Sequence, residues 1–282
     1  MLDRMKTICF SLNRDYVNYI RTCIKMLLQH TVSPELIRFV FLLSNDVTDH
    51  EIMQLSEQAD LAGAPKPRFI YPEKECECGF RLNGGDNLLG VYDQTPFYRI
   101  LLPDLLSEDK CLYLDADVAV CGNVEDLFEA DLADVYIMGV TDRLCLEKSK
   151  LDLVTDYGLP FGYYINSGVL MMNLKLLRED GISKRMQKLG RSRFFPYLDQ
   201  DIINYSCEGN VRLLDKRFNV FPDDTPSDLQ FLREHIAGTE DIFSEYALCN
   251  PTIIHYIGQR KPWTDQTVHY AEIWLDHAER YR

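Results

Sequence analysis

The feature that most constrains the fold is an alternation, in the first third of the chain, of continuous apolar runs with segments of helical periodicity. The apolar runs span residues 7–12, 37–43 and 68–71, and the helical segments between them span 16–28 and 51–61. Strands without polar alternation are buried on both faces, as in parallel sheets covered by helices. The pattern therefore predicts an α/β fold with helices on both faces of a mainly parallel sheet.

The remaining elements predict one domain, residues 1–282, with a decorated C-terminal half. Further strands are expected at 111–114, 135–140, 168–173, 211–214 and 253–255, and helices at 96–106, 124–128, about 174–189, from 199, and around 229 and 270. A long loop is expected at 72–87. It contains Cys76-Glu-Cys78, but no second cysteine pair or histidine cluster completes a zinc site there.

Net charge limits the partners of the chain. At −14, the chain repels nucleic acid and anionic membrane surfaces, and no basic patch in the sequence offsets this. A phosphate-binding site in such a chain needs a cation or local Lys and Arg side chains.

Cysteine use and the absence of a targeting segment favour a cytoplasmic protein. The nine cysteines are scattered, and several lie in apolar segments as reduced thiols do. We expect no secretory signal after Met1, and no stretch approaches the roughly 20 apolar residues that span a bilayer.

Asp115 and Asp117 follow the apolar strand at 111–114 directly. Ligands of open α/β sheets bind beyond the carboxyl ends of strands. Two carboxylates one residue apart on a turning backbone can face one cation, and hard oxygen ligands suit Mg²⁺ or Mn²⁺. The alternative is a turn in which Asp bonds local backbone.

His255 ends another apolar strand and is followed by Gly258 and Lys261. A histidine in this place is either a satisfied core residue or a ligand. The glycine allows close backbone approach and the lysine can pair with a phosphate. As a third ligand, an imidazole favours Mn²⁺ over Mg²⁺.

Asp199, Gln200 and Asp201 begin a predicted helix. One interpretation is an N-cap with a favourable first-turn carboxylate. The other places Asp199 on a sugar hydroxyl and Gln200 beside a reacting carbon.

Asn166-Ser167-Gly168 and Arg99 also allow two interpretations each. The tripeptide is a tight turn before a strand, or a small-residue loop that leaves room for a sugar ring. Arg99 lies in an otherwise apolar helix, where it is either solvated or buried against a sugar or phosphate.

Five segments in order resemble glycosyltransferase family 8, whose members are retaining enzymes of the GT-A fold. The segments are Phe10-Ser-Leu-Asn-Arg-Asp-Tyr16, Tyr98-Arg99, Leu112-Tyr-Leu-Asp-Ala-Asp117, Tyr164-Ile-Asn-Ser-Gly-Val-Leu170, and Leu198-Asp-Gln-Asp201 with His255-Tyr-Ile-Gly-Gln-Arg-Lys-Pro-Trp263. The resemblance covers nearly the whole chain and implies a Rossmann-like, mixed and mainly parallel sheet. It also implies a nucleotide-binding half at 1–120 and a sugar and acceptor half at 121–282.

The resemblance further implies a role for each matching residue. The expected Mn²⁺ ligands are Asp115, Asp117 and His255, and the expected diphosphate contacts are Gly258 and Lys261. Uracil and ribose are expected to be held by Ser11, Asn13 and Tyr16, the donor site to be lined by Ala116 between the aspartates, and the donor sugar to be contacted by Arg99, Asn166, Ser167, Asp199 and Gln200. Asp142 is expected near the acceptor, and Asp201 next to the reacting centre. The expected donor is UDP-glucose or UDP-galactose, and the expected acceptor is a saccharide or glycolipid.

Two departures from the family pattern bear on these expectations. Asn13 stands where bacterial galactosyltransferases usually carry Asp, and its amide adds a donor. From Ile253 onward, four basic residues are balanced by four acidic ones, so the C-terminus supplies no polybasic membrane anchor.

Three alternatives remain at this point. A nucleotidyltransferase that makes nucleotide sugars normally carries a Gly-rich loop after strand one, and residues 11–15 lack glycine. A non-catalytic nucleotide-sugar-binding protein would not require the Asp/Asp/His set. A self-glucosylating enzyme like glycogenin is a variant within the family.

Overall fold

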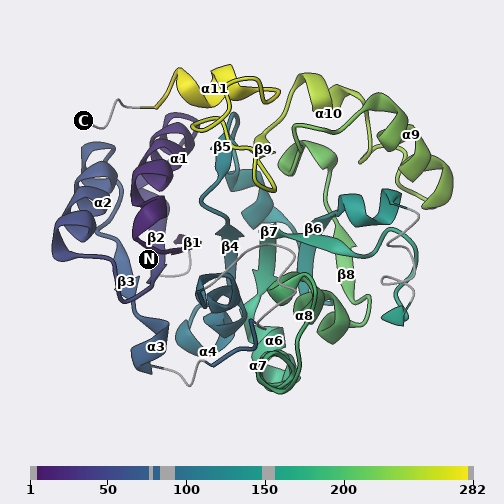
Figure 1. Cartoon of the computed structure of the whole chain (residues 1–282), viewed down its shortest axis with the longest axis horizontal. Helices are drawn as coiled ribbons and strands as arrows, with labels where there is room; N and C mark the ends of the chain where they lie inside the picture. The colour runs from purple at the N-terminus through teal and green to yellow at the C-terminus, as the bar shows by residue number, and fades with distance from the viewer. Residues whose placement is uncertain (1–4, 76–78, 83–92, 148–155, 279–282) are drawn as a thin grey trace.

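A seven-stranded sheet forms the centre of the computed structural model, which describes residues 5–75, 79–82, 93–147 and 156–278 (Figure 1). The strand order is β3-β2-β1-β4-β7-β6-β8, and β5 pairs with β9 in a separate ribbon. The bounds are β1 Lys6–Leu12, β2 Ile37–Leu43, β3 Arg68–Ile70, β4 Lys110–Leu114, β5 Val118–Val120, β6 Ile137–Thr141, β7 Ile165–Asn173, β8 Val211–Leu213 and β9 Ile253–His255. Only β7 runs antiparallel to its neighbours in the main sheet, so the mixed, mainly parallel sheet is confirmed.

Both faces of the sheet are buried, which explains the continuous apolar runs. In β1, Ile8 and Phe10 belong to one hydrophobic core, whereas Cys9 belongs to the other. The same alternation holds in β4, where Leu112 and Leu114 face the first core while Tyr113 faces the second. Each strand therefore needs apolar side chains at consecutive positions.

Helices cover the two faces as separate layers. The first core packs against α1 (Val17–Gln29), α2 (Asp49–Leu61) and α11 (Ala271–Leu275), and the second against the 3₁₀ helix η4 (Thr95–Leu101) and α4, α6, α7 and α8. The bounds of these last helices are α4 Leu102–Leu105, α6 Leu174–Glu179, α7 Ile182–Ser192 and α8 Leu198–Cys207. The short α3 (Pro72–Glu75) follows β3, and α9 (Pro226–His235) and α10 (Tyr246–Cys249) lie with α11 along the upper side of Figure 1.

Several chain segments meet at one edge of the sheet. Strands β1, β4 and β6 all end there, and antiparallel β7 begins there. The register pairs Leu114 with Val169 and Thr141 with Ile165, and the Asp115 amide donates to the Gly168 carbonyl at 2.8 Å. The residues after β4 and β6 are thereby placed beside the first residues of β7.

Three of the predicted helices differ from the structure in their continuity or in their type of helix. The helix expected at 174–189 is two helices, because Gly181 adopts a left-handed conformation (φ +70°) between α6 and α7. The helix expected at 96–106 is 3₁₀ up to Leu101, and Pro103 has no N–H to donate to the Arg99 carbonyl in an α-helical turn. The helix expected at 124–128 is a 3₁₀ turn at Glu125–Glu129.

The other predicted elements agree better with the structure, and part of one predicted segment lies outside the described residues. Strand β5, three residues long, was not predicted. Cys76-Glu-Cys78 and half of the loop expected at 72–87 lie outside the described residues, and α3 occupies the first four positions of that loop. Within the described part, seven cysteines are free thiols, and no helix is long and apolar enough to cross a membrane.

We predict that Gly181→Ala lowers the free energy of unfolding by about 1 kcal/mol, because an L side chain is strained in the left-handed conformation. Among the described residues outside the local backbone, none has a heavy atom within 4 Å of the position a Cβ would take, so crowding does not contribute. Gly181→Asn is the matched control, since Asn tolerates this conformation better and should lose less. Urea unfolding measures both, and an equal loss for the two variants would contradict this account.

Candidate active site

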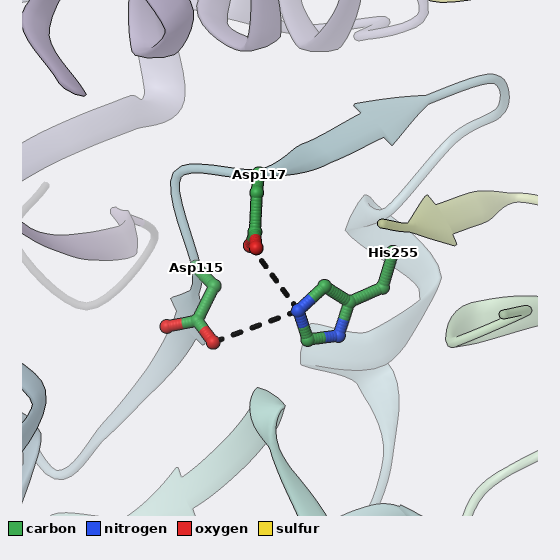
Figure 2. A group of neighbouring side chains, drawn as sticks. All are labelled: Asp115, Asp117 and His255. Atoms are coloured by element: carbon green, nitrogen blue, oxygen red, sulfur yellow. Dashed lines mark ion pairs between the residues drawn. The ribbon is translucent and has the colours of Figure 1, made fainter. Parts of the chain in front are cut away.

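Asp115, Asp117 and His255 converge at the carboxyl edge of the sheet (Figure 2). The His255 Nε2 atom lies 3.6 Å from Asp115 Oδ2 and 3.2 Å from Asp117 Oδ1. The pairing of β5 with β9 produces this approach, because Val118 is opposite His255 and the Tyr256 amide donates to the Asp117 carbonyl at 3.0 Å. One atom from each of the three side chains fits within 4.8 Å of the others.

These three side chains fit a divalent cation. Two carboxylate oxygens and one imidazole nitrogen are a common donor set for first-row metals. The space beside them depends on Gly168, where a Cβ would lie 2.1 Å from His255 Cε1 and 2.7 Å from Asp115 Oδ2. The missing side chain at this position keeps the ligand atoms free of steric overlap.

Lys261 compensates the charge of Asp117. Its ammonium group donates to the Asp117 carboxylate and to the Tyr256 carbonyl, and the residue is buried. Burial alone would raise the pKa of Asp117, but Lys261 and His255 outweigh it and hold the pKa well below its usual range. Asp117 is therefore ionised at every ordinary pH.

Arg99 is buried, with only 5% of its surface exposed, so the solvated interpretation is wrong. Its guanidinium bonds Asp115 Oδ1 at 2.8 Å and the Ser167 carbonyl, and it stacks 4.4 Å from the Tyr113 ring centre. Helix η4 covers the sheet face to which Tyr113 points. A cation is thereby placed against the first aspartate.

Asp199 has a buried oxygen without a hydrogen-bond donor. Asp199 Oδ2 lies 3.1 Å from Arg99 Nε, whose hydrogen points to the Pro96 carbonyl at 3.0 Å, so this contact is an ion pair only. Burial, reinforced by Asp115 and opposed by Arg99, raises the pKa of Asp199 to about 6. Tyr197 holds the N-cap position of α8, so the capping interpretation of Asp199 is wrong.

Asn166 and Ser167 are strand residues of β7, which corrects both the turn and the loop interpretation. Antiparallel pairing with β6, in which Thr141 is opposite Ile165, extends the strand back to Ile165. The Asn166 amide group donates to Asp142 Oδ2 at 2.9 Å and to Gln200 Oε1 at 3.1 Å, and the Ser167 N–H donates to the same Gln200 oxygen at 3.0 Å. The structure thus brings Asn166, Ser167, Asp142 and Gln200 together.

Asp201 adjoins this cluster through the hydroxyl group of Tyr164. Its two oxygens accept from the Tyr164 hydroxyl at 2.6 Å and from the Tyr197 N–H at 2.8 Å. The Gln200 amide group donates to the same Tyr164 oxygen at 3.3 Å. Asp201 therefore orients Tyr164, which in turn holds Gln200.

Ser11, Asn13 and Tyr16 lie where β1 ends and α1 begins. The Asn13 amide group donates to Asp93 Oδ2 at 2.7 Å, and its own carbonyl oxygen is buried without a partner in the described part of the chain. The Tyr16 ring packs edge-on against Trp263, and burial together with the nearby Asp117 and Asp115 raises its pKa. These residues therefore adjoin the aspartate pair.

Ala116 and Gly258 complete the predicted set. Ala116 is 6% exposed between the two aspartates, and Gly258 follows β9 with a left-handed φ of +74°. Apart from its chain neighbours, no described residue has a heavy atom within 4 Å of the position a Gly258 Cβ would take, so its backbone conformation is what requires glycine.

Three residues of the site were not predicted from the sequence: Asp93, Tyr164 and Asn219. Asn219 is fully buried between His255 and Asn166. Its sequence signal is an amide within the apolar segment Phe218-Asn-Val-Phe221. A buried amide has to find partners, but the sequence does not indicate which.

Comparison with known proteins gives one consistent result. The family model described as glycosyl transferase family 8 matches residues 7–267. The glycosyltransferase GlyE of Streptococcus pneumoniae is 26% identical over 284 residues, which cover 99% of this chain and 62% of that protein. The lipopolysaccharide 1,3-galactosyltransferase of Salmonella typhimurium is 30% identical over 177 residues, which cover 59% of this chain and 48% of that protein.

A crystal structure of the galactosyltransferase LgtC, in complex with donor and acceptor sugar analogs, is similar with a TM-score of 0.73 and 27% identity. The match covers 96% of this chain and 95% of that chain. By contrast, the chain spans less than two thirds of the length of the two curated relatives.

We predict that Gly168→Ala weakens Mn²⁺ binding about 10-fold or more, because the new Cβ overlaps His255 and Asp115. Calorimetric titration with Mn²⁺ measures this. Gly139→Ala is the matched control, because its Cβ would lie 2.9 Å from Ile165 Cδ1, away from the three ligands. Both variants should lose folding stability because of overpacking. Equal Mn²⁺ affinities for the two variants would contradict the assignment of the cation site to Asp115, Asp117 and His255.

Proposed function

The chain belongs to glycosyltransferase family 8, and from this premise we propose that it transfers a hexose, glucose or galactose, from a UDP-sugar to an acceptor hydroxyl with retention and in dependence on Mn²⁺. The observation that carries the proposal is the convergence of Asp115, Asp117 and His255 beside the buried Arg99. The acceptor is a saccharide or a glycolipid.

Asp115, Asp117 and His255 would hold the metal ion. The imidazole favours Mn²⁺, with Mg²⁺ as the harder alternative. When bound, the ion supplies Lewis-acid stabilisation of the negative charge that develops on the departing UDP. Binding of a diphosphate also has to overcome the net charge of −14, and Lys261 and Arg99 are the buried cations placed to assist.

The donor sugar is proposed to bind against Asp199, Asn166 and Ser167. The unsatisfied Asp199 oxygen is an acceptor for a sugar hydroxyl, and a charged hydrogen bond of this kind is among the stronger ones. Arg99 fixes this carboxylate relative to Asp115, so the sugar subsite and the metal site share one positioning cation.

Front-face attack is the proposed route to retention. A double displacement needs a carboxylate free to act as nucleophile on the opposite face. Gln200 stands at that place in the family pattern, and its oxygen already accepts two hydrogen bonds. Asp201 is turned toward Tyr164. The acceptor hydroxyl, near Asp142, would attack from the side of departing UDP, with a UDP phosphate oxygen as base.

Asn13 and Asp93 are proposed to recognise uracil jointly. Asp93 accepts from the Asn13 amide group and so turns the Asn13 carbonyl oxygen away from itself. A carbonyl oxygen matches the N3–H donor of uracil, whereas the unprotonated N3 of cytosine would need a donor. The pair therefore performs the task of the single Asp that is usual in the family.

The two other functions are less well supported. A nucleotidyltransferase would need a glycine-rich loop after β1, where residues 11–15 carry none. A binding protein without activity would not require the buried Asp199 beside the metal ligands. The cytoplasmic location remains a prediction from the sequence.

We predict Mn²⁺-dependent UDP release from UDP-glucose or UDP-galactose, and a product of unchanged anomeric configuration by NMR. Asp117→Asn should reduce release about 100-fold or more, because it removes a charged ligand. Asp60→Asn is the control, since this exposed α2 residue loses the same charge far from the site. Absence of release and of binding for both donors would overturn the proposed function.

We predict that Asn13→Asp weakens UDP binding about 5- to 10-fold, because it sets two carboxylates against each other at the Asp93 contact. The double variant Asn13→Asp with Asp93→Asn should restore affinity. Calorimetry with UDP and CDP gives both affinity and base preference. Unchanged UDP affinity in the Asn13→Asp single variant would contradict the shared role.

A further inference from the structure

A buried chain of amide side chains links β7 to the imidazole of His255. Asn219, which follows the 3₁₀ turn at Lys216–Phe218, is 0% exposed. Its amide nitrogen donates to Asn166 Oδ1 at 3.0 Å, and its oxygen lies 3.1 Å from His255 Nδ1. Asn219 therefore contacts a metal ligand on the side opposite the metal site.

The orientation of Asn166 can be fixed from the backbone. The Gly168 N–H is a donor under all conditions, and it lies 3.0 Å from Asn166 Oδ1. The oxygen of the Asn166 amide must therefore face Gly168. Its NH₂ group then faces Asp142 Oδ2 and Gln200 Oε1, which are both acceptors. No other assignment of this amide satisfies all its neighbours.

The orientation of Asn166 also determines which ring nitrogen of His255 faces a hydrogen-bond acceptor on Asn219. Because Asn219 meets the Asn166 oxygen, the atom of Asn219 at this contact must be its NH₂ group. The oxygen of Asn219 is then the atom that faces His255 Nδ1. An oxygen accepts only from a protonated nitrogen, so Nδ1 carries the hydrogen. Nε2 faces Asp115 and Asp117, so with a cation bound between them the neutral ring presents its lone pair on Nε2, whereas without the cation the two carboxylates accept a hydrogen from Nε2.

We propose that Asn219 is a positioning residue of the metal site. It sets the tautomer and the ring orientation of His255 so that Nε2 is presented to the cation, and it takes its own orientation from Asn166 in the donor-sugar subsite. A ligating histidine usually donates its second N–H to an acceptor, and loss of that acceptor typically costs about 10- to 100-fold in metal affinity. The proposal rests on the proposed metal site.

Three variants separate this role from ordinary core packing. Asn219→Leu removes the acceptor and should weaken Mn²⁺ binding about 10- to 100-fold. Asn219→Asp keeps the acceptor for His255 but sets its second oxygen against Asn166, so it should lose stability and retain Mn²⁺ affinity. Asn204→Leu is the control. Asn204 is 1% exposed and bonds the Ile165 backbone, so this variant should lose stability alone.

The experiment measures Mn²⁺ affinity by calorimetry and, by ¹⁵N NMR of the metal-free protein, which ring nitrogens of His255 carry hydrogen. The expected result is hydrogen on Nδ1 in the wild type and Asn219→Asp, and loss of the Nδ1 hydrogen from part of the Asn219→Leu molecules. Hydrogen on Nε2 with none on Nδ1 in the wild type would overturn the proposal, whatever the variants do. The proposal would also be overturned if the loss of Mn²⁺ affinity paralleled the loss of folding stability in all three variants.

The two readouts distinguish this proposal from the proposed function. If the wild type does not bind Mn²⁺, the metal site itself is wrong, and the NMR result still decides the tautomer. If the wild type binds Mn²⁺ and Asn219→Leu binds it equally well with hydrogen on Nδ1, the positioning role of Asn219 is wrong while the metal site stands.

Discussion

Two aspartates held at the end of one strand repel each other, and the site is organised around the compensation of their charge. Arg99 bonds Asp115 and Lys261 bonds Asp117, and both cations are buried. Loss of either would leave a partly buried carboxylate uncompensated, which is costlier than an unmade surface pair. Arg99 also reaches Asp199, so charge compensation at the proposed metal site and the placement of the proposed sugar subsite depend on one side chain.

The antiparallel direction of β7 brings the second half of the site to the same edge. Ligands bind at the carboxyl ends of strands in sheets of this kind. Because β7 runs against β4 and β6, its amino-terminal residues reach that edge, where Asn166 lies beside Asp142 and Gly168 lies beside Asp115. A parallel strand in this position would have placed Asn173 there instead. The mixed character of the sheet is thus a requirement of the site.

The parts of this arrangement that depend on local pattern were predictable from the sequence. Apolar runs identify the strands because both sheet faces are buried, and Asp115, Asp117 and His255 lie directly at strand ends. The GT-A fold and the family were also predicted correctly. The break at Gly181 was not predicted, because an isolated glycine also occurs within helices.

Other parts depend on contacts between distant residues. Asn219 lies 53 positions from Asn166 and 36 from His255. Arg99 was ambiguous because burial of a cation depends on partners that only the folded chain supplies. Asn166 and Ser167 were interpreted as a turn or loop because small polar residues are typical of turns, whereas the pairing of β7 with β6 at Ile165 makes them part of a strand. In each case, the local sequence is compatible with two structures and tertiary contacts decide between them.

A neutral amide with satisfied hydrogen bonds, Gln200, lies in the proposed sugar subsite where a double displacement would need a free carboxylate, and this has two consequences. The Gln200 oxygen accepts from Asn166 and Ser167, and such an oxygen is a weaker nucleophile than a free carboxylate, which favours front-face attack. The same saturation fixes the orientation of Asn166, and through Asn219 it reaches the imidazole of His255. A free carboxylate at position 200 would accept from the same donors, but it would add negative charge beside Asp142 and Asp199. In a chain of net charge −14, the neutral amide is the group that keeps the network ordered without further repulsion of the donor diphosphate.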